Sequence, residues 1–320
     1  MKVIANLFLL GLSLLVAFAI GEVASRYIAP ISPGPSIVDM AGNKQKISYV
    51  EAGRTFRIIT PDFDAKTSIT EEGYRAPAAK GSPEVIFMGD SFTYAQGVKD
   101  EEAFPALYCA QKNLSCANLA VPGSSTLYEI DRLEQYITEN NWNPKKVHFF
   151  FFTGNDFSDN LGADDKRSKG QRYEPGEMNL NPQESADKGI VEKTIDLGLK
   201  YSNLLRIAYF QILPMIRANP EEDAKNLEKA LAITKAEFSR LEALSIKYGF
   251  EYQLYSIFTK PEIKLNLYQD LGKKLQAQTN KPIIMLGDLF KDNVAEYYFP
   301  TDGHFSVEGN AKLAEFLLSQ

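Results

Sequence analysis

A serine that can act as a nucleophile stands at the end of an apolar run. The run VIFM, residues 85–88, stops at Gly89-Asp90-Ser91. Open α/β sheets place their chemistry at the carboxyl ends of such strands. A serine hydroxyl is a weak nucleophile until a base takes its proton. Gly, Asp and Ser are also common in turns, so this segment alone does not identify a nucleophile. A catalytic serine also requires a base from elsewhere in the chain.

The chain contains two histidines, and their surroundings differ. His148 lies within KVHFFFF, residues 146–152, a continuous apolar run typical of a buried strand. We therefore interpret His148 as a core residue. His304 lies in a polar loop, two positions after Asp302. We expect His304 to be the base for Ser91, and Asp302 to orient its ring and stabilise its cation.

Two further segments with turn-forming residues follow predicted strands. The segment 118–123, ending in Gly123, follows the second strand, and Gly154-Asn155-Asp156 follows the third. Carboxyl ends of parallel strands meet at one edge of a sheet, so we expect both segments to lie near Ser91. Each segment alone is explained as a turn, and the function prediction depends on the whole set.

In order and placement, these segments resemble the SGNH hydrolases, the GDSL esterase and lipase family. The family has Gly-Asp-Ser after the first strand, Gly after the second, Gly-Asn-Asp or a close variant after the third, and Asp and His near the C-terminus. The resemblance covers roughly residues 72–320, the size of one large domain. Glu72-Gly73-Tyr74-Arg75 and Gly97-Val98 are similar to a bacterial, exported, membrane-anchored branch.

The resemblance implies roles for five residues. The catalytic triad would be Ser91, His304 and Asp302. The oxyanion hole would consist of the backbone N–H groups of Ser91 and Gly123 and the side chain of Asn155. Loss of one such donor removes about 2.7–4 kcal/mol of transition-state stabilisation in a well-studied protease.

The acid is the position at which the chain departs from the family pattern. One residue, Gly303, separates Asp302 from His304, where the family most often has two. Asp288, after the predicted fifth strand, is therefore an alternative acid. We interpret Asp90 and Asp156 as structural residues that bond backbone groups in their turns.

Apolar runs alternate with helical patterns from residue 84 onward. This alternation predicts an α/β fold with a three-layer, flavodoxin-like, doubly wound parallel five-stranded sheet. Strands are expected at 84–88, 115–120, 146–152, 250–257 and 281–287, and the main helices at 103–114, 124–140, 221–249 and 306–320.

We place the domain at residues 81–320, with one segment expected before it and one inserted within it. Residues 28–80 predict a linker and a small irregular cap, because Pro and Gly clusters interrupt short β-like runs. A helical insertion at about 156–248 is expected to cover one end of the site. Within it, YSNLLRIAYFQI, residues 201–212, carries an apolar stripe that faces the core, a membrane or a substrate chain. The core is the simplest of the three.

The N-terminal segment, residues 1–27, predicts a transmembrane signal anchor. An uncharged apolar run extends from Val3 to Gly21, long enough to cross a hydrocarbon core of roughly 30 Å. Glu22 and Arg26 follow one helical turn apart, which favours a helix that continues beyond the membrane. Ala17-Phe18-Ala19 leaves a cleavable signal peptide as the alternative. In both cases the rest of the chain is expected to be exported. An uncleaved anchor would make it a single-pass protein of a bacterial membrane, with its domain on the periplasmic or extracellular side. Cleavage would make it a secreted protein.

Composition and cysteine content bear on the expected partners, cofactors and disulfides. The net charge of −6 argues against a nucleic-acid partner, which a basic face would bind. We expect no metal or cofactor, since neither metal-ligand spacing nor a glycine-rich phosphate loop occurs. Cys109 and Cys116 predict a disulfide, which an exported location permits. Two buried free thiols are the alternative.

We therefore predict a serine esterase or acylhydrolase that cleaves an O-acyl ester through an acyl-Ser91 intermediate. Its expected partners are an acyl-ester small molecule or acylated glycan, or a lipid ester, and the membrane through the N-terminal helix. One alternative is an O-acyltransferase acting on an envelope or exopolysaccharide glycan, whose acyl-enzyme turnover would accelerate with added glycan. The other is a non-catalytic envelope-assembly or binding protein, against which the complete Ser, Gly, Asn and His set argues.

Overall fold

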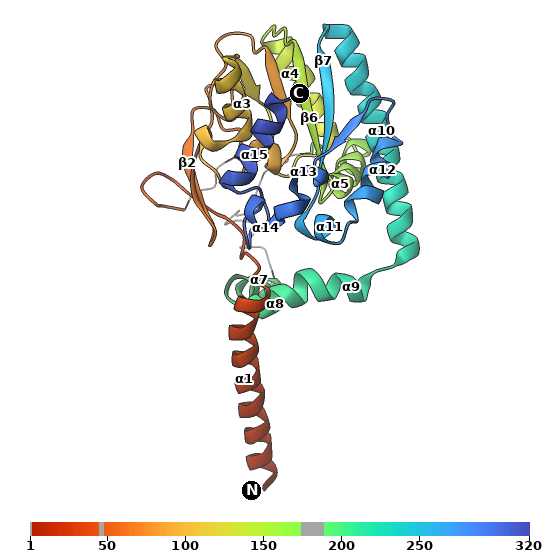
Figure 1. Cartoon of the computed structure of the whole chain (residues 1–320). Helices are drawn as coiled ribbons and strands as arrows, with labels where there is room; N and C mark the ends of the chain where they lie inside the picture. The colour runs from red at the N-terminus through yellow and green to blue at the C-terminus, as the bar shows by residue number, and fades with distance from the viewer. Residues whose placement is uncertain (1, 45–47, 174–188) are drawn as a thin grey trace.

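A five-stranded parallel sheet forms the centre of the molecule (Figure 1). The computed structural model describes residues 2–44, 48–173 and 189–320. The strand order is β5-β4-β6-β7-β8, which is the flavodoxin-like order 2-1-3-4-5 when this sheet's strands are counted along the chain. The predicted fold class is thus confirmed. The strands are β4 (Val85–Met88), β5 (Cys116–Asn118), β6 (Lys146–Phe152), β7 (Glu251–Ile257) and β8 (Ile283–Met285).

Alternate residues of the strands face two separate hydrophobic layers. Ile86 and Met88 pack with α4 and α10, whereas Val85 and Phe87 pack with α3 and α15. Since successive strand residues point to opposite faces, helices on both sides require a continuous apolar run. The helices concerned are α3 (Phe104–Lys112), α4 (Thr126–Glu139), α5 (Asp156–Ser168), α10 (Pro220–Tyr248) and α15 (Val307–Leu318).

The segment expected as an irregular cap contains a three-stranded antiparallel sheet. Its strands are β1 (Ser36–Val38), β2 (Thr55–Ile59) and β3 (Asp64–Ser68). Phe56 and Ile58 on the buried face pack against Tyr94, three residues after Ser91. The cap therefore supports the loop that carries the candidate nucleophile.

The N-terminal helix α1 (Lys2–Ile28) projects from the rest of the molecule (Figure 1). It is long and apolar enough to cross a membrane by length and composition, and its apolar window has no buried residue. Contacts with the body begin at its last turns, where Glu22 and Ser25 meet residues 202–204.

A row of short helices, here called the crossing helices (residues 190–217), passes over the end of α1 (Figure 1). It comprises α7 (Ile190–Tyr201), α8 (Asn203–Ile207), the π-helical turn η2 (Ala208–Ile212) and α9 (Leu213–Arg217). Leu205, Tyr209, Phe210 and Ile212 are exposed. The expectation that the stripe in residues 201–212 faces the core is therefore wrong, because helical periodicity does not distinguish a core from another apolar surrounding.

Short helices follow the carboxyl ends of the central strands. In Figure 1, α11 and α14 lie at the end of the domain nearest the crossing helices. The edge of the sheet that carries the turn-forming segments thus faces the side from which α1 leaves. The short helices are α2 (Ser91–Tyr94), η1 (Asp100–Glu102), α11 (Lys260–Lys264), α12 (Tyr268–Gln276), α13 (Gly287–Phe290), η3 (Lys291–Asn293) and α14 (Val294–Tyr297).

A disulfide between Cys109 and Cys116 joins the end of α3 to the first residue of β5. The chain reverses between these elements, which brings the two Cα atoms within 6.2 Å.

Candidate active site

Ser91 is presented by a sharp turn directly after β4. Gly89 has φ of +149°, and a Cβ there would lie 2.8 Å from the carbonyl oxygen of Phe150. Only glycine fits this backbone without displacing its neighbours. Asp90 then caps α2 by accepting a hydrogen bond from the backbone N–H of Phe92 at 3.0 Å. The turn and cap fix Ser91 in the first position of α2.

Ser91, His304 and Asp302 form a hydrogen-bonded series. Ser91 Oγ lies 2.8 Å from Nε2 of His304, and Nδ1 of His304 contacts Oδ1 of Asp302. Because a carboxylate only accepts, Nδ1 carries the ring proton and Nε2 is free to accept from the serine. The Asp302 side chain is 5% exposed and that of His304 17%. The arrangement can take a proton from Ser91 and hold it.

Of the two candidate acids, Asp302 is the one that meets the histidine. Gly303, with φ of +97°, turns the chain so that one intervening residue suffices. Asp288 instead accepts hydrogen bonds from the Tyr268 hydroxyl at 2.8 Å and the Lys291 ammonium at 2.9 Å.

Asp62 holds the loop that carries Asp302, and sequence reasoning missed it. Its Oδ2 accepts hydrogen bonds from the backbone N–H groups of Thr301 and Asp302, both at 2.7 Å. Lys260 donates from the other side to the carbonyl oxygen of Pro300 at 2.9 Å. No local pattern predicts these contacts, because Asp62 lies in the cap and Asp302 near the C-terminus.

Gly123 and Asn155 follow the two strands that flank β4. β5 and β6 are the neighbours of β4 in the sheet, so their carboxyl ends open on either side of the Ser91 turn. The Gly123 loop is bound to that turn, since the N–H of Val121 donates to the carbonyl of Gly89 at 3.1 Å. The structure thus places both predicted oxyanion-hole residues at the edge that carries Ser91.

The side chain of Asn155 is held by a carboxylate on the next helical turn. Its Nδ2 donates to Oδ2 of Asp159 at 2.7 Å. A primary amide has two N–H donors, so one remains for a developing oxyanion. Among the described residues no donor reaches Asn155 Oδ1. Asp159 is a second contact that sequence reasoning missed.

Three buried carboxyl groups, Asp90, Glu129 and Asp156, and the half-buried Asp159 lie close to one another near this edge. Burial raises the pKa of Glu129 to about 8 although Ser124 donates to it at 2.7 Å. Burial, then the charge of Asp90, raise the pKa of Asp159 to about 7. The pKa values of Asp90 and Asp156 are also raised, chiefly by burial. Asp90 and Asp156 bond backbone N–H groups, as predicted for structural residues.

His148 is a core residue, as its strand setting predicts. It is buried, its Nδ1 lies 2.9 Å from the hydroxyl of Tyr255, and its ring stacks on Phe87 with centroids 5.1 Å apart. Burial lowers its pKa to about 3. A neutral, enclosed imidazole cannot serve Ser91.

Arg75 ties the cap to the chain around the nucleophile. Its guanidinium is fully buried and donates to the carbonyl oxygens of Tyr94, Ala95 and Val98, the last at 2.7 Å. The sequence stretch Glu72–Arg75 resembles one branch of the family, but it does not predict this structural role for Arg75.

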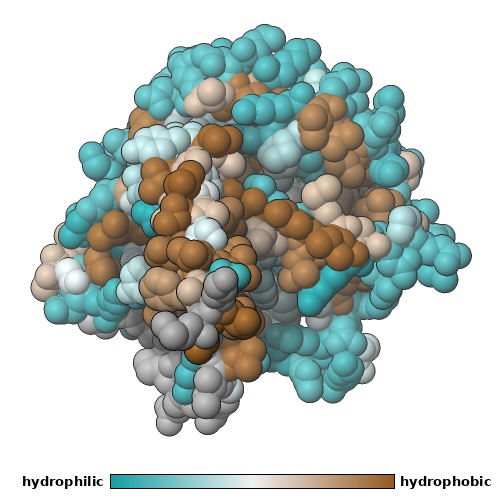
Figure 2. Space-filling view, turned by 90° about the horizontal axis from the view of Figure 1, so that it is seen from below, coloured by the Kyte–Doolittle hydropathy of each residue, from teal (hydrophilic) through white to brown (hydrophobic). Residues whose placement is uncertain are grey.

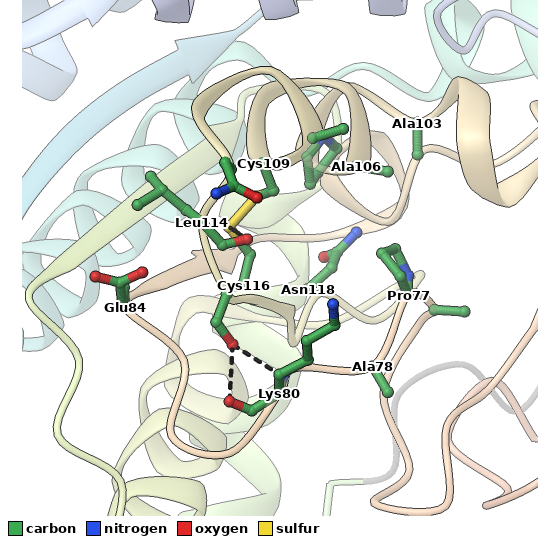
Figure 3. A pocket seen from close by; sticks show the side chains of 15 residues that line it. Pro77, Ala78, Lys80, Glu84, Ala103, Ala106, Cys109, Leu114, Cys116 and Asn118 are labelled. Carbon is green, nitrogen blue, oxygen red and sulfur yellow. Dashed lines mark hydrogen bonds between the residues drawn. A yellow bond between two sulfur atoms is a disulfide. The ribbon is translucent and has the colours of Figure 1, made fainter.

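A cavity of about 430 Å³ lies beside the disulfide (Figure 3). Lys80, Glu84 and Asn118 line it together with Cys109 and Cys116. Among the described residues that line it, none belongs to the Ser91, His304 and Asp302 series.

A comparison with known sequence families agrees with the predicted GDSL esterase and lipase family. Residues 85–317 match the sequence family described as GDSL-like Lipase/Acylhydrolase. No curated protein is similar enough to the chain to count as a match.

Solved structures similar to the chain include the acetylxylan esterase Axe2 from Geobacillus stearothermophilus, at 14% identity and a TM-score of 0.38, covering 75% of this chain and 94% of that one. A lipolytic G-D-S-L family protein from Veillonella parvula has 13% identity and a TM-score of 0.36, with coverage of 73% and 96%. A carbohydrate esterase has 14% identity and a TM-score of 0.36, and the match covers 77% of this chain and 66% of that one.

Proposed function

Because the chain belongs to the GDSL-like lipase and acylhydrolase family, matched over residues 85–317, we propose that it is a serine esterase with Ser91 as nucleophile. One observation carries the proposal: Ser91 Oγ lies 2.8 Å from His304 Nε2, whose ring is held on its far side by Asp302. This is the geometry that activates a serine hydroxyl.

The proposed reaction has two halves. Ser91 Oγ attacks the ester carbonyl carbon while its proton passes to His304 Nε2. The tetrahedral intermediate collapses, the C–O bond to the alcohol breaks, and His304 returns the proton to the departing oxygen. Water then attacks acyl-Ser91, giving its proton to His304, and collapse releases the carboxylic acid and restores the Ser91 hydroxyl.

We assign charge stabilisation to the backbone N–H groups of Ser91 and Gly123 and to Nδ2 of Asn155. Such donors act best when fixed in advance, because they then need no reorganisation as charge develops. The contact of Asn155 with Asp159, at 2.7 Å, supports this assignment by holding the amide in one orientation.

We assign α1 to a membrane anchor that keeps the esterase domain on the exported side. Its uncharged run can span a hydrocarbon core of roughly 30 Å, and the helix continues without interruption to Ile28. The disulfide supports export. Retention of the full chain in the membrane pellet after alkaline carbonate washing, with an intact N-terminus by mass, is expected. A soluble chain shortened near Ala19 would instead indicate a cleaved signal peptide.

The decisive experiment is covalent labelling of the full chain, in mild detergent, with a fluorophosphonate. Intact mass should show a single adduct that disappears in Ser91→Ala and His304→Ala. Ser239→Ala, whose hydroxyl bonds Lys235 within its own helix, is the matched control and should label normally. A separate, unlabelled sample of the same protein is then given acyl esters of carbohydrates and lipids of increasing chain length.

Each result has a distinct meaning. An adduct with ester turnover supports hydrolysis, and turnover that accelerates when a glycan acceptor is added indicates acyl transfer. A folded protein that forms no adduct overturns the proposed nucleophile and leaves a binding or assembly role.

A further inference from the structure

We propose that the crossing helices, residues 190–217, lie in the surface of the lipid bilayer with their apolar side chains among the acyl chains. The catalytic edge of the sheet then faces the bilayer, and the ester substrate is one presented at its surface. The inference rests on the proposed anchoring by α1 and adds a second membrane contact.

The sequence of α1 fixes the height of these helices. Its uncharged run ends at Gly21, which is where a spanning helix leaves the hydrocarbon core. The next residue, Glu22, accepts hydrogen bonds from the Ser202 hydroxyl at 2.7 Å and from the backbone N–H of Asn203 at 2.8 Å. The first turn of α8 is therefore attached to α1 at the level where membrane meets water.

Asn203 stabilises the contact between α1 and α8 through several hydrogen bonds. It is 1% exposed, its Oδ1 accepts from the N–H of Ile31 at 2.8 Å, and its Nδ2 donates to Ser25 at 3.1 Å and to Ala29 at 3.0 Å. A buried amide with all these partners specifies one arrangement. The crossing helices thus keep their direction relative to α1.

The crossing helices expose several large apolar side chains, whose contact with water is unfavourable. Met215 is 77% exposed, Ile216 74% and Phe210 54%. Seen from the side on which α1 leaves, hydrophobic residues gather into a band beside that helix, with hydrophilic residues around it (Figure 2). Large apolar patches of this kind mark contact surfaces, and a helix with such a face beside a spanning segment matches an interfacial helix.

A groove in the crossing helices offers space for an acyl chain. It encloses about 380 Å³, and nearly all of its lining is apolar. Gly198 permits the close approach of α7 and α8, since a Cβ there would lie 2.9 Å from Leu205 Cδ1. The lining includes Ile195, Leu199, Leu205, Ala208, Tyr209 and Leu213.

Charge and aromatic residues agree with a position at the lipid headgroups. Residues 190–217 contain four basic and two acidic side chains, although the whole chain carries −6. Arg26, Lys200 and Arg217 are exposed, as are Tyr27 and Tyr201. Basic residues attract anionic lipids, and tyrosine is enriched where membrane meets water.

The catalytic loop is linked directly to this layer. The backbone N–H of Ser32, four residues after α1 ends, donates to the carbonyl of Thr301 at 3.2 Å. Thr301 precedes Asp302, the residue that contacts His304. A substrate at the bilayer surface is therefore within reach of the Ser91 edge without the domain having to turn over.

Site-directed spin labelling of the full chain tests the placement. The two native cysteines form the disulfide, so a nitroxide attaches only to an introduced cysteine. Phe210→Cys and Met215→Cys report on the crossing helices, and Leu9→Cys reports on α1. The matched control is Ile246→Cys, an equally exposed apolar residue near the far end of α10, about 40 Å along that helix from α9.

The labelled proteins are placed in vesicles of phosphatidylcholine and phosphatidylglycerol in equal parts. Collision rates with oxygen, which concentrates in lipid, are compared with those of a water-soluble nickel chelate. Near-ultraviolet circular dichroism checks that each variant is folded. We expect labels at 9, 210 and 215 to favour oxygen and the label at 246 to favour nickel.

Two other outcomes overturn the inference in different ways. If 210 and 215 behave like 246 while 9 favours oxygen, the anchor stands and the crossing helices are not in the bilayer. If the label at 9 also favours nickel, anchoring fails and this inference fails with it. Neither outcome affects the fluorophosphonate test of Ser91, which concerns the chemistry alone.

Discussion

The Asn155 amide donates a hydrogen bond to the Asp159 carboxylate, with Nδ2 and Oδ2 2.7 Å apart. This contact gives the proposed oxyanion donor a fixed orientation before substrate arrives. It also couples that donor to a half-buried acid whose pKa is raised to about 7.

Asp159→Ala should lower kcat and leave KM nearly unchanged, because the amide loses its orientation while the substrate's other contacts remain. Misplacement of a catalytic group costs up to about 100-fold in rate, whereas Asn155→Ala, which removes the donor, should cost about 100- to 1,000-fold. Steady-state kinetics of both variants and of the double variant measure this. Asp165→Asn, an exposed carboxylate on the same helix paired with Lys169, is the control. Fully additive effects of the two variants would show that Asp159 does not act through Asn155.

The buried carboxyl groups should make the protein less stable as pH rises. The pKa values of Asp159 and Glu129, about 7 and about 8, lie above their ordinary values near 4 because of burial. The folded state therefore holds protons that the unfolded state has released. Stability from these groups is fully present below about pH 4 and is lost as pH rises through 7 and 8.

Urea unfolding of the detergent-solubilised chain at pH 5 and pH 8 measures this trend. The midpoint should be lower at pH 8. Asp159→Asn and Glu129→Gln, which cannot ionise, should reduce the difference, and Asp165→Asn should leave it unchanged. Parallel pH dependence in all four proteins would exclude these groups as its source.

Asp62→Ala should destabilise the protein and slow the reaction. Two backbone N–H groups, on Thr301 and Asp302, lose an ionised acceptor, and a hydrogen bond to a charged group contributes about 1.5–3 kcal/mol. Asp62→Asn keeps an acceptor oxygen and should recover part of both losses. Asp64→Ala, two residues away, removes a half-exposed ion pair with Arg57 and should cost at most about 1 kcal/mol. Equal effects at both positions would contradict the proposed support of Asp302.

Gly89→Ala should be among the most damaging single substitutions in the chain. The added Cβ would approach Thr93 Oγ1 to 2.3 Å and the Phe150 carbonyl oxygen to 2.8 Å, at a φ of +149°. Backbone strain of this kind costs about 1–3 kcal/mol, and the Ser91 turn must shift. Gly162→Ala, in α5 with no atom within 4 Å of its Cβ, should instead be neutral or stabilising by up to about 1 kcal/mol. Thermal unfolding and fluorophosphonate labelling rate distinguish the two.

The sequence alone predicts those elements whose burial produces a simple pattern of apolar residues. The runs 84–88 and 146–152 read as buried strands and are β4 and β6 almost residue for residue. Ser91, His304 and Asp302 were predicted from residue type and strand ends, and the structure brings the three together.

Other features left no local signal. β3 (Asp64–Ser68) is short and mostly polar, so its sequence indicates an irregular segment of the cap and not a strand. Asp62 and Arg75 act on residues distant in the chain, and a single sequence does not reveal such contacts. The sequence does not show that the stripe of the crossing helices is exposed, because periodicity describes an apolar face and not what covers it.

If α1 is the membrane anchor proposed above, the hydrogen bond from Ser32 to Thr301 has a kinetic consequence. A domain joined to its helix by such a short connection samples a thin layer above the surface that holds the helix. For an ester confined to that surface, the encounter rate depends on molecules per unit area and on lateral diffusion, and dilution of the bulk solution leaves it unchanged. A long flexible linker would spread the same site through a much larger volume and lower its effective concentration. With the proposed anchoring and a substrate at the bilayer surface, turnover would respond to substrate density in the plane and not to concentration in the surrounding fluid.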